Sequence, residues 1–223
     1  MKGLGRKLAI CLLIICALSE SVAAQTAFSH GAREEKKVAL SFDDGPHPRY
    51  TGEILAVLEE YGIPATFFMI GKNVELYPQV AKAVYEKGHE IGNHTYTHPH
   101  MKKTSVNELK TEVQKTEKAL AACGIPAPKL FRPPEGFRSV EQVNMLRALG
   151  YQTVVWSVDT HDWQGRTVGD IVTSVVDHIQ GGDVLLFHDY TSGKNTTIAA
   201  LKQVIPMLLQ NGYRFVKISE LMY

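Results

Sequence analysis

A regular alternation of two kinds of segment most constrains the fold of this chain of 223 residues. Short apolar runs alternate with longer stretches whose apolar residues recur every three or four positions, as on one face of a helix. The helical stretches end at glycine, a frequent helix stop, at Gly62, Gly88, Gly124, Gly150, Gly182 and Gly212. The apolar runs cover residues 38–42, 65–70, 90–91, 129–131, 153–156, 184–187 and 214–216. Near-continuous apolar runs are typical of parallel strands that are covered by helices.

Repeated strand–helix units are compatible with two architectures, a parallel barrel and an open, doubly wound sheet. Dinucleotide-binding open sheets carry a glycine-rich turn after the first strand, and this sequence has none there. Capping-box patterns that begin at Ser105 and Ser139 predict two helix starts. No interior linker divides the chain, so we predict one α/β domain over residues 37–223, after a short N-terminal extension at 25–36.

Residues 1–24 resemble a signal peptide for export more than a part of the domain. Three basic residues precede an apolar run at 8–18, and small residues at 22–24 form a cleavage site before Gln25. The run is shorter than the roughly 20 residues that span a bilayer. We therefore expect cleavage and a secreted or cell-wall-associated protein, with an uncleaved membrane anchor as the alternative.

Composition and charge exclude several classes of protein. Hydrophobic residues make up 44% of the chain and charged residues 21%, which excludes collagen-like, disordered and coiled-coil proteins. The formal net charge of +1 becomes −1 without residues 1–24, and no basic stripe remains to bind nucleic acid. Nothing in the sequence indicates an obligate protein partner, and we expect a monomer.

Polar clusters follow five of the predicted strands, where each strand ends. The clusters cover residues 43–45, 94–98, 132–134, 159–163 and 188–189. In both candidate architectures the chemistry is found in loops at the carboxyl ends of the strands. We therefore expect these five distant segments to form one site.

Two of these clusters indicate a metal site. His94 and His98 are four residues apart, a spacing by which one short segment supplies two nitrogen ligands. A third ligand would be Asp44 or Asp43, and three protein ligands leave a position for water, as in catalytic metal sites. Adjacent side chains leave the backbone in different directions, so the other aspartate is expected to act as general base.

The later clusters suggest a general acid and an apolar wall. His188 could protonate a leaving group if Asp162 or Asp159 fixed its titration. Trp156 and Trp163 could line an acyl pocket or stack on a sugar, and core packing is the alternative for both. Structural roles alone are expected for three further histidines, His30, His100 and His178.

The five clusters resemble, in order, the five motifs of the polysaccharide deacetylase family. This family is also called the NodB homology family or carbohydrate esterase family 4. The segments that carry the resemblance are Ser-Phe-Asp-Asp-Gly-Pro at 41–46, His-Thr-Tyr-Thr-His at 94–98, Arg-Pro-Pro-Glu-Gly at 132–136, Asp-Thr-His-Asp-Trp at 159–163 and Leu-Phe-His at 186–188. The resemblance extends from about residue 37 to the C-terminus.

This resemblance implies a fold, a cofactor and a set of metal-site residues. The fold would be a distorted (β/α) barrel with fewer than eight strands. The cofactor would be a divalent metal, most often Zn²⁺, with Co²⁺ as another possibility. The resemblance makes Asp43 the general base, held by Arg132. It makes Asp44, His94 and His98 the metal ligands.

The same resemblance assigns the acid and the substrate-binding side chains. His188 would be the acid, tuned by Asp162. The residues that would contact the substrate are Pro134, Glu135, Trp163 and Leu186. Family members commonly have an aromatic residue at the position of Glu135. A carboxylate there changes the shape and charge of the neighbouring sugar subsite, whereas the backbone N–H that would bind the oxyanion stays available.

The activity implied is metal-dependent hydrolysis of N-acetyl groups on the amino sugars of a polysaccharide. Export places the protein beside the cell wall, so peptidoglycan N-acetylglucosamine is the leading substrate. The alternatives are a chitin oligosaccharide deacetylase, an acetyl xylan esterase, and a non-catalytic carbohydrate-binding relative. Non-catalytic relatives usually lose the base or a metal ligand, whereas Asp43, Asp44, His94, His98 and His188 are all present here.

Overall fold

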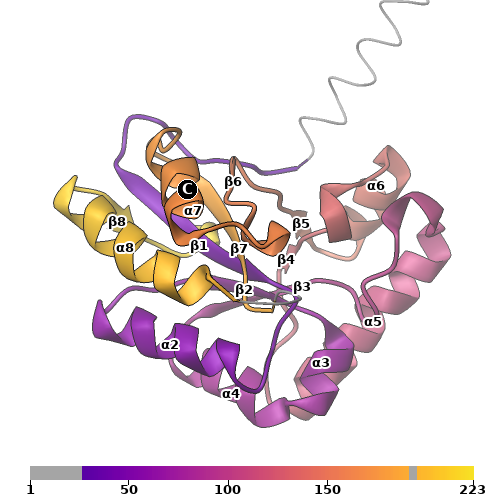
Figure 1. Ribbon diagram of the computed structural model, residues 1–223. Coiled ribbons are helices and arrows are strands. Elements are labelled where there is room, and N and C mark those ends of the chain that lie inside the picture. The colour runs from indigo at the N-terminus through magenta and orange to yellow at the C-terminus, as the bar shows by residue number, and fades with distance from the viewer. Residues whose placement is uncertain (1–26, 191–194) are drawn as a thin grey trace, which may run out of the picture.

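The computed structural model describes residues 27–190 and 195–223, in which strands and helices alternate as the sequence predicts (Figure 1). The predicted signal peptide at 1–24 lies outside the described residues. In the described part of the chain, no helix has the length and apolar character needed to cross a membrane.

The strands form one parallel sheet. They are β1 (Lys37–Asp43), β2 (Thr66–Met69), β3 (Glu90–Asn93), β4 (Leu130–Phe131), β5 (Gln152–Thr153), β6 (Val158–Asp159), β7 (Val184–His188) and β8 (Arg214–Phe215). Seven of them lie on a continuous path in the order β5-β4-β3-β2-β1-β7-β6, and β8 adds an eighth strand beside the start of β1. Each of the pairings between these strands is parallel.

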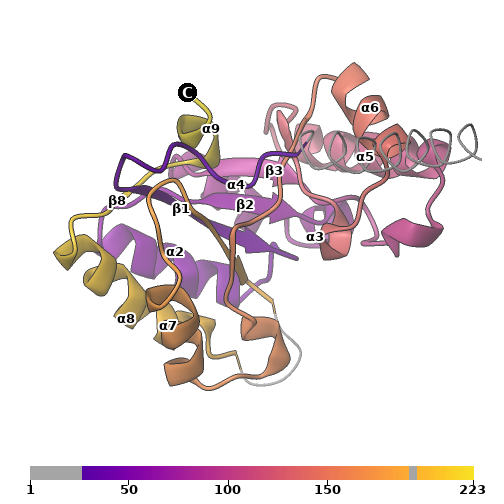
Figure 2. The same ribbon diagram turned by 90° about the horizontal axis from the view of Figure 1, so that it is seen from above.

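Most of the helices cover this sheet on its outer side (Figures 1 and 2). They are α2 (Tyr50–Glu60), α3 (Gly71–Leu76), α4 (Pro78–Glu86), α5 (Val106–Ala122), α6 (Val140–Ala148), α7 (Val168–Val176) and α8 (Thr197–Gln210). The short α9 (Ile218–Leu221) lies on the inner side, where Ile218 and Leu221 join a cluster with Ala39. Short 3₁₀ turns lie at Met101–Lys103, Pro134–Gly136 and Asp162–Gln164. Both predicted capping boxes are present, with Ser105 before α5 and Ser139 before α6. The six predicted stop glycines all have a positive φ.

The sheet is a distorted barrel that does not close. Within the described residues, no ladder joins β5 to β6, so the barrel stays open between these strands. The strand predicted at 153–156 is shorter than expected, and β6 at Val158–Asp159 was not predicted. The physical reason is that this segment leaves β4, its partner at β5, and crosses to pair with β7.

The two faces of β1 explain how the fold positions polar residues. Side chains alternate along a strand, so one face of β1 carries Val38, Leu40 and Phe42, which join the core under the surrounding helices. The other face carries Ala39, Ser41 and Asp43 toward the barrel interior. Ala39 packs in an inner cluster with Phe68 and with residues of α9, and the polar Ser41 and Asp43 follow toward the carboxyl end. The inner face is therefore apolar at one end and polar at the other.

Candidate active site

Four of the five predicted clusters, together with Glu135 directly after the fifth, line one pocket of about 550 Å³ at the carboxyl ends of the strands. Its lining residues are Asp43, Asp44, His94, His98, Glu135, Trp156, Asp159, Trp163, Leu186 and His188. Three other predicted site residues, Arg132, Pro134 and Asp162, are buried beside the lining. The expectation of one site assembled from distant segments is therefore confirmed.

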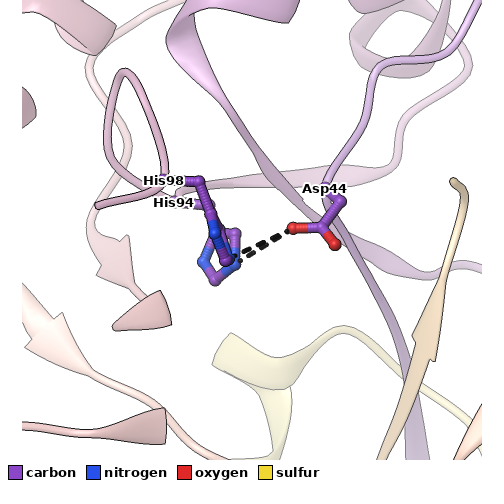
Figure 3. A group of neighbouring side chains, drawn as sticks. All are labelled: Asp44, His94 and His98. Atoms are coloured by element: carbon purple, nitrogen blue, oxygen red, sulfur yellow. Dashed lines mark ion pairs between the residues drawn. The ribbon is translucent and has the colours of Figure 1, made fainter. Parts of the chain in front are cut away.

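Asp44 and two histidines face one another across this pocket. Asp44 Oδ1 lies 3.6 Å from His94 Nε2 and 3.4 Å from His98 Nε2 (Figure 3). The two rings lie side by side, with centroids 5.0 Å apart, and the aspartate approaches from the loop after β1. Asp43 Oδ2 lies 3.8 Å from His94 Nε2, and within the described residues Asp43 forms no ion pair with His98. Of the two aspartates, Asp44 is thus the one that faces both histidines.

The donor set and its spacing fit a divalent cation. Ligand atoms about 2.0–2.1 Å from a tetrahedral metal lie about 3.3–3.4 Å apart, close to the separations of Asp44 Oδ1 from the two nitrogens. The three donor atoms all lie within 4.8 Å of one another. Asp44 Oδ1 is buried, and within the described residues it accepts no hydrogen bond, which leaves its lone pairs directed at the two rings.

The surroundings of His94 prepare its imidazole for this role. His94 Nδ1 lies 2.8 Å from the carbonyl oxygen of Arg132, so Nδ1 donates and Nε2 keeps its lone pair for the pocket. Burial lowers the pKa of His94 more than the nearby charges of Asp43 and Asp44 raise it. The ring is therefore held neutral, the form that binds a metal.

A buried ion pair holds the other aspartate. Arg132 Nη1 lies 2.7 Å from Asp43 Oδ1 and also donates to Ser41 Oγ at 2.9 Å. The guanidinium carbon stands 4.1 Å from the centroid of the Phe68 ring, a cation–π contact that fixes its plane. Asp43 Oδ1 is thus occupied, and Oδ2 is the oxygen left on the side of the pocket.

A second ion pair lies beside the first, because His188 of β7 is the register partner of Asp43 in β1. His188 Nδ1 stands 2.7 Å from Asp162 Oδ1, and Asp162 Oδ2 accepts the backbone N–H of His188. Burial alone would lower the pKa of His188. The hydrogen bond and charge of Asp162, together with Asp43 and Asp44, outweigh this effect and raise that pKa to about 9. Nδ1 faces Asp162, so Nε2 is the nitrogen available to the pocket.

Asp159, the other carboxylate considered for His188, has a different partner. Its Oδ1 accepts the backbone N–H of His161 at 2.8 Å, at the left-handed residue before the turn Asp162–Gln164. Asp159 lines the pocket. Within the described residues it forms no ion pair with His188. Between the two carboxylates, the structure pairs Asp162 with His188.

In the described part of the chain, the loop that follows β4 has one backbone donor without an acceptor, at a residue that lines the pocket. Gly136 donates its N–H to the carbonyl of Pro133 and Arg132 donates to that of Asn93, while neither proline of the loop has an N–H. Within the described residues, the N–H of Glu135 donates no hydrogen bond. Glu135 also adopts a left-handed conformation with φ 57°, which a residue with a side chain occupies at some cost. Such strain is often retained where the backbone serves a site.

The predicted substrate-side residues occupy different depths. Leu186 is 2% exposed and lines the inner wall, whereas Trp163 is 49% exposed and stands at the mouth. Pro134 is buried and supports the loop without lining the pocket in the described structure. Trp156 lines the pocket and packs so closely on Gly136 that a Cβ there would lie 2.8 Å from the ring.

His100 corrects one expectation from the sequence. It was expected to have a structural role away from the site, but His100 Nδ1 lies 2.9 Å from Glu135 Oε1. The pair joins the loop that carries His98 to the loop after β4, and both side chains are largely exposed. The sequence contains one signal for this contact, since His100 follows His98 by two residues.

Two pairings that support the site could not be found from the sequence, although Asp162 and Asp189 both lie in predicted clusters. Thr197, at the start of α8, donates to Asp162 Oδ2 at 2.7 Å. Asp189 is buried beneath Gly45 and accepts a hydrogen bond from Thr51, and burial raises the pKa of Asp189 to about 7. These partners are 35 and 138 residues apart in the chain, and no short motif connects them.

Comparison with known proteins agrees with this geometry. The model of the family "Polysaccharide deacetylase" matches residues 30–154. The peptidoglycan-N-acetylglucosamine deacetylase of Bacillus cereus is 41% identical over 190 residues, which cover 84% of this chain and 89% of the relative. The chitooligosaccharide deacetylase of Azorhizobium caulinodans is 31% identical over 193 residues, which cover 81% of this chain and 92% of the relative.

A solved structure shares the fold as well. The crystal structure of the peptidoglycan N-acetylglucosamine deacetylase Bc1960 matches with a TM-score of 0.85 and 35% sequence identity, over 88% of this chain and 92% of that chain. A family model that matches more than half of the chain and relatives of 31–41% identity over most of it lead to one conclusion. The chain belongs to the polysaccharide deacetylase family.

Proposed function

We propose that this polysaccharide deacetylase removes the acetyl group from N-acetylglucosamine units of peptidoglycan, outside the cell that exports it. The observation that carries the proposal is the Asp44, His94 and His98 group, which shares one pocket with the Arg132-held Asp43 and with His188. The choice of polymer is supported by the similarity of the chain to peptidoglycan deacetylases, in sequence and in fold. Export is supported by the signal-peptide pattern at residues 1–24, ahead of a deacetylase domain at 37–223.

Asp44, His94 and His98 are proposed to hold Zn²⁺. Two imidazoles and one carboxylate are ligands that zinc accepts in catalytic sites, where three protein ligands leave a position open. When bound, the cation polarises a carbonyl oxygen and lowers the pKa of water. The neutral state of His94 favours its binding, as does Asp44 Oδ1, which accepts no hydrogen bond from the described residues.

Asp43 is proposed to be the general base. Arg132 occupies Asp43 Oδ1, so Oδ2 remains to accept a proton from the water that attacks the acetyl carbonyl. The buried guanidinium and the adjacent Ser41 keep the carboxylate in one orientation. A general base must lie within hydrogen-bond reach of its proton, and this arrangement provides such a position on the pocket floor.

His188 is proposed to be the general acid. Its pKa, raised to about 9, keeps the imidazolium protonated at neutral pH, and Nε2 can deliver the proton to the amine that leaves. The backbone N–H of Glu135 is proposed to stabilise the oxyanion that forms when water adds to the acetyl carbonyl. Leu186 and the aromatic rings of the pocket are proposed to surround the acetyl methyl group.

The decisive experiment measures acetate release from peptidoglycan, chitin oligomers and acetylated xylan, each with and without a chelator. We expect the highest kcat/KM on peptidoglycan, loss of activity on chelation, and recovery with Zn²⁺ or Co²⁺. A preference for chitin oligomers would instead assign the activity of the Azorhizobium relative. A preference for acetylated xylan would indicate an acetyl xylan esterase.

Full activity in a preparation shown to be free of metal would refute the metal-dependent mechanism. No release of acetate from any of the three polymers would refute the proposal that the protein is an enzyme. The protein is expected to act as a monomer on its polysaccharide.

A further inference from the structure

The segment that presents His94 and His98 has an unusual backbone. Thr95 and His98 have φ values of 67° and 56°, in the left-handed region that side chains disfavour. An isolated chain would seldom adopt two such residues within five positions. One hydrogen bond within the segment, from the His98 N–H to Thr95 Oγ1 at 3.1 Å, supports this conformation. Contacts from outside the segment hold the rest of it, and with it the spacing of the two imidazoles.

One carboxylate supplies most of the contacts to the middle of this segment. Glu112 Oε2 accepts the backbone N–H of Tyr96 at 2.9 Å and of Thr97 at 2.7 Å, and it also accepts the Thr97 hydroxyl at 3.0 Å. Tyr96 and Thr97 lie between the two histidines. Glu112 is half-buried on α5, 14 residues after His98 in the chain, and no motif singles it out.

The carbonyl groups of the same segment are held from the other side. The N–H groups of Gly71 and Lys72, at the start of α3, donate to the carbonyl oxygens of Thr95 and Tyr96 at 2.9 and 3.0 Å. Helices α3 and α5 pack closely where Gly71 meets Thr116, since a Cβ on Gly71 would lie 2.6 Å from the Thr116 hydroxyl. The segment is thus fixed between two packed helices, with Glu112 holding its N–H groups.

Asn93 completes this frame at the end of β3. Its Oδ1 accepts the N–H of Thr95, and its Nδ2 donates to the carbonyl of Val113, the residue after Glu112. Asn93 is fully buried, so its removal would disturb the strand end as well as the loop. Glu112 is more exposed and sits outside the barrel wall, which makes it the support that can be altered with the least damage to the fold.

We propose that Glu112 is a positioning residue of the metal site, whose carboxylate fixes the separation of the His94 and His98 imidazoles. Within the described residues, Glu112 forms no hydrogen bond or ion pair with either imidazole, and it acts through the backbone of Tyr96 and Thr97. Outer contacts that orient metal ligands commonly contribute 10–100-fold to metal affinity. The inference rests on the metal site of the proposed function and extends it to a residue on α5.

The test measures metal binding without substrate. The apo forms of the wild type, Glu112→Ala, Glu112→Gln, Glu112→Asp and the control Gln114→Ala are titrated with Zn²⁺ against a competing chromophoric chelator. Gln114 is exposed on the same helix, two residues from Glu112. The visible absorption of the Co²⁺ forms reports the coordination geometry, and melting curves of the apo forms report folding.

We expect Glu112→Ala to bind Zn²⁺ roughly 10–100-fold more weakly than the wild type, with an altered Co²⁺ spectrum. Glu112→Gln should stay near the wild type, because its amide oxygen can still accept the two N–H groups. Glu112→Asp is too short to reach both groups and should weaken binding while folding normally, which keeps the test valid if the alanine variant does not fold. Gln114→Ala should match the wild type.

Three results would overturn the inference. Equal zinc affinity in the wild type, Glu112→Ala and Glu112→Asp would make Glu112 a structural residue only. Equal weakening in Glu112→Gln and Glu112→Ala would attribute the effect to charge instead of to the positioning of the backbone. A folded wild-type protein that binds no Zn²⁺ would refute the metal site itself, an outcome distinct from failure of the Glu112 variants alone.

Discussion

The floor and the rim of the pocket are built from different kinds of interaction. The floor consists of Asp43, His94, Arg132 and Asp162, none of which is more than 3% exposed. The rim consists of His100, Glu135 and Trp163, which are 49–74% exposed. Each part contains an ion pair between segments that are distant in the chain. The pair is Arg132–Asp43 in the floor and His100–Glu135 in the rim.

This difference in burial predicts a difference in function. Exposed ion pairs contribute about 0–1 kcal/mol and hold their side chains loosely, whereas loss of one partner from a buried pair costs about 3–5 kcal/mol. The floor is therefore suited to chemistry that needs one geometry. The rim is suited to selection among sugars. Substitutions in the floor should therefore have larger effects on activity than substitutions in the rim.

Asp43→Asn should lower kcat by at least the 10²–10⁴-fold that general base catalysis typically contributes. The variant should keep its metal, because Asp44, His94 and His98 are unchanged, and added metal should not restore turnover. Rate and metal content are measured together. Loss of metal from this variant would contradict the role of base.

The structure adds a control that the sequence did not suggest. Asp43 is the partner of the fully buried Arg132, so Asp43→Asn should also lower the melting temperature. The loss should be smaller than for complete removal, since the asparagine oxygen can still accept from the guanidinium. Activity is therefore compared at a temperature at which both proteins are folded.

Asp44→Asn should weaken metal affinity by more than the roughly 10–100-fold that an outer contact contributes. Its rate should fall at limiting metal and recover in part when Zn²⁺ is in excess, unlike the rate of Asp43→Asn. Metal titration and acetate release on both variants decide the assignment. If Asp44→Asn retains metal while Asp43→Asn loses it, the two roles are reversed.

Asp162→Asn should move the high-pH limb of activity to lower pH. His188 acts when protonated, so activity is lost as pH rises through its pKa, which Asp162 raises to about 9 in the wild type. Without the carboxylate, that pKa falls, by roughly 1–3 units for the loss of a close opposite charge. A pH profile of kcat measures this shift. An unchanged limb would mean that His188 is not the titrating acid.

Substitutions at the rim should have the smallest effects, and Glu135→Tyr should change KM and the preference among polymers several-fold, with kcat on the best substrate nearly unchanged. The substitution alters an exposed side chain at the rim, and the backbone N–H of residue 135 is retained. His100→Ala, which removes only the ionic partner, should shift KM in a smaller way. A collapse of kcat in Glu135→Tyr with KM unchanged would place the side chain of Glu135 in the chemistry and remove the distinction between floor and rim.

The residues of the floor could be predicted from the sequence. They lie in compact motifs at strand ends, where their types, spacing and order indicate one site. The rim was predicted only in part. The sequence shows that Glu135 departs from the residue common in the family. It does not predict the partner His100, because two exposed side chains on different loops share no sequence pattern.

The sequence by itself determined the alternation of parallel strands and helices and most of the residues that meet in the pocket. Apolar runs, helical spacing, stop glycines and polar clusters are local patterns, and each acts through neighbours a few positions away. The tertiary structure decided which of the adjacent aspartates faces both histidines and which carboxylate binds His188. It also brought Glu112 of α5 against the loop between His94 and His98. These choices depend on backbone turns such as the left-handed Asp44 at φ 76° and on the packing of helices distant in sequence, which no local pattern encodes.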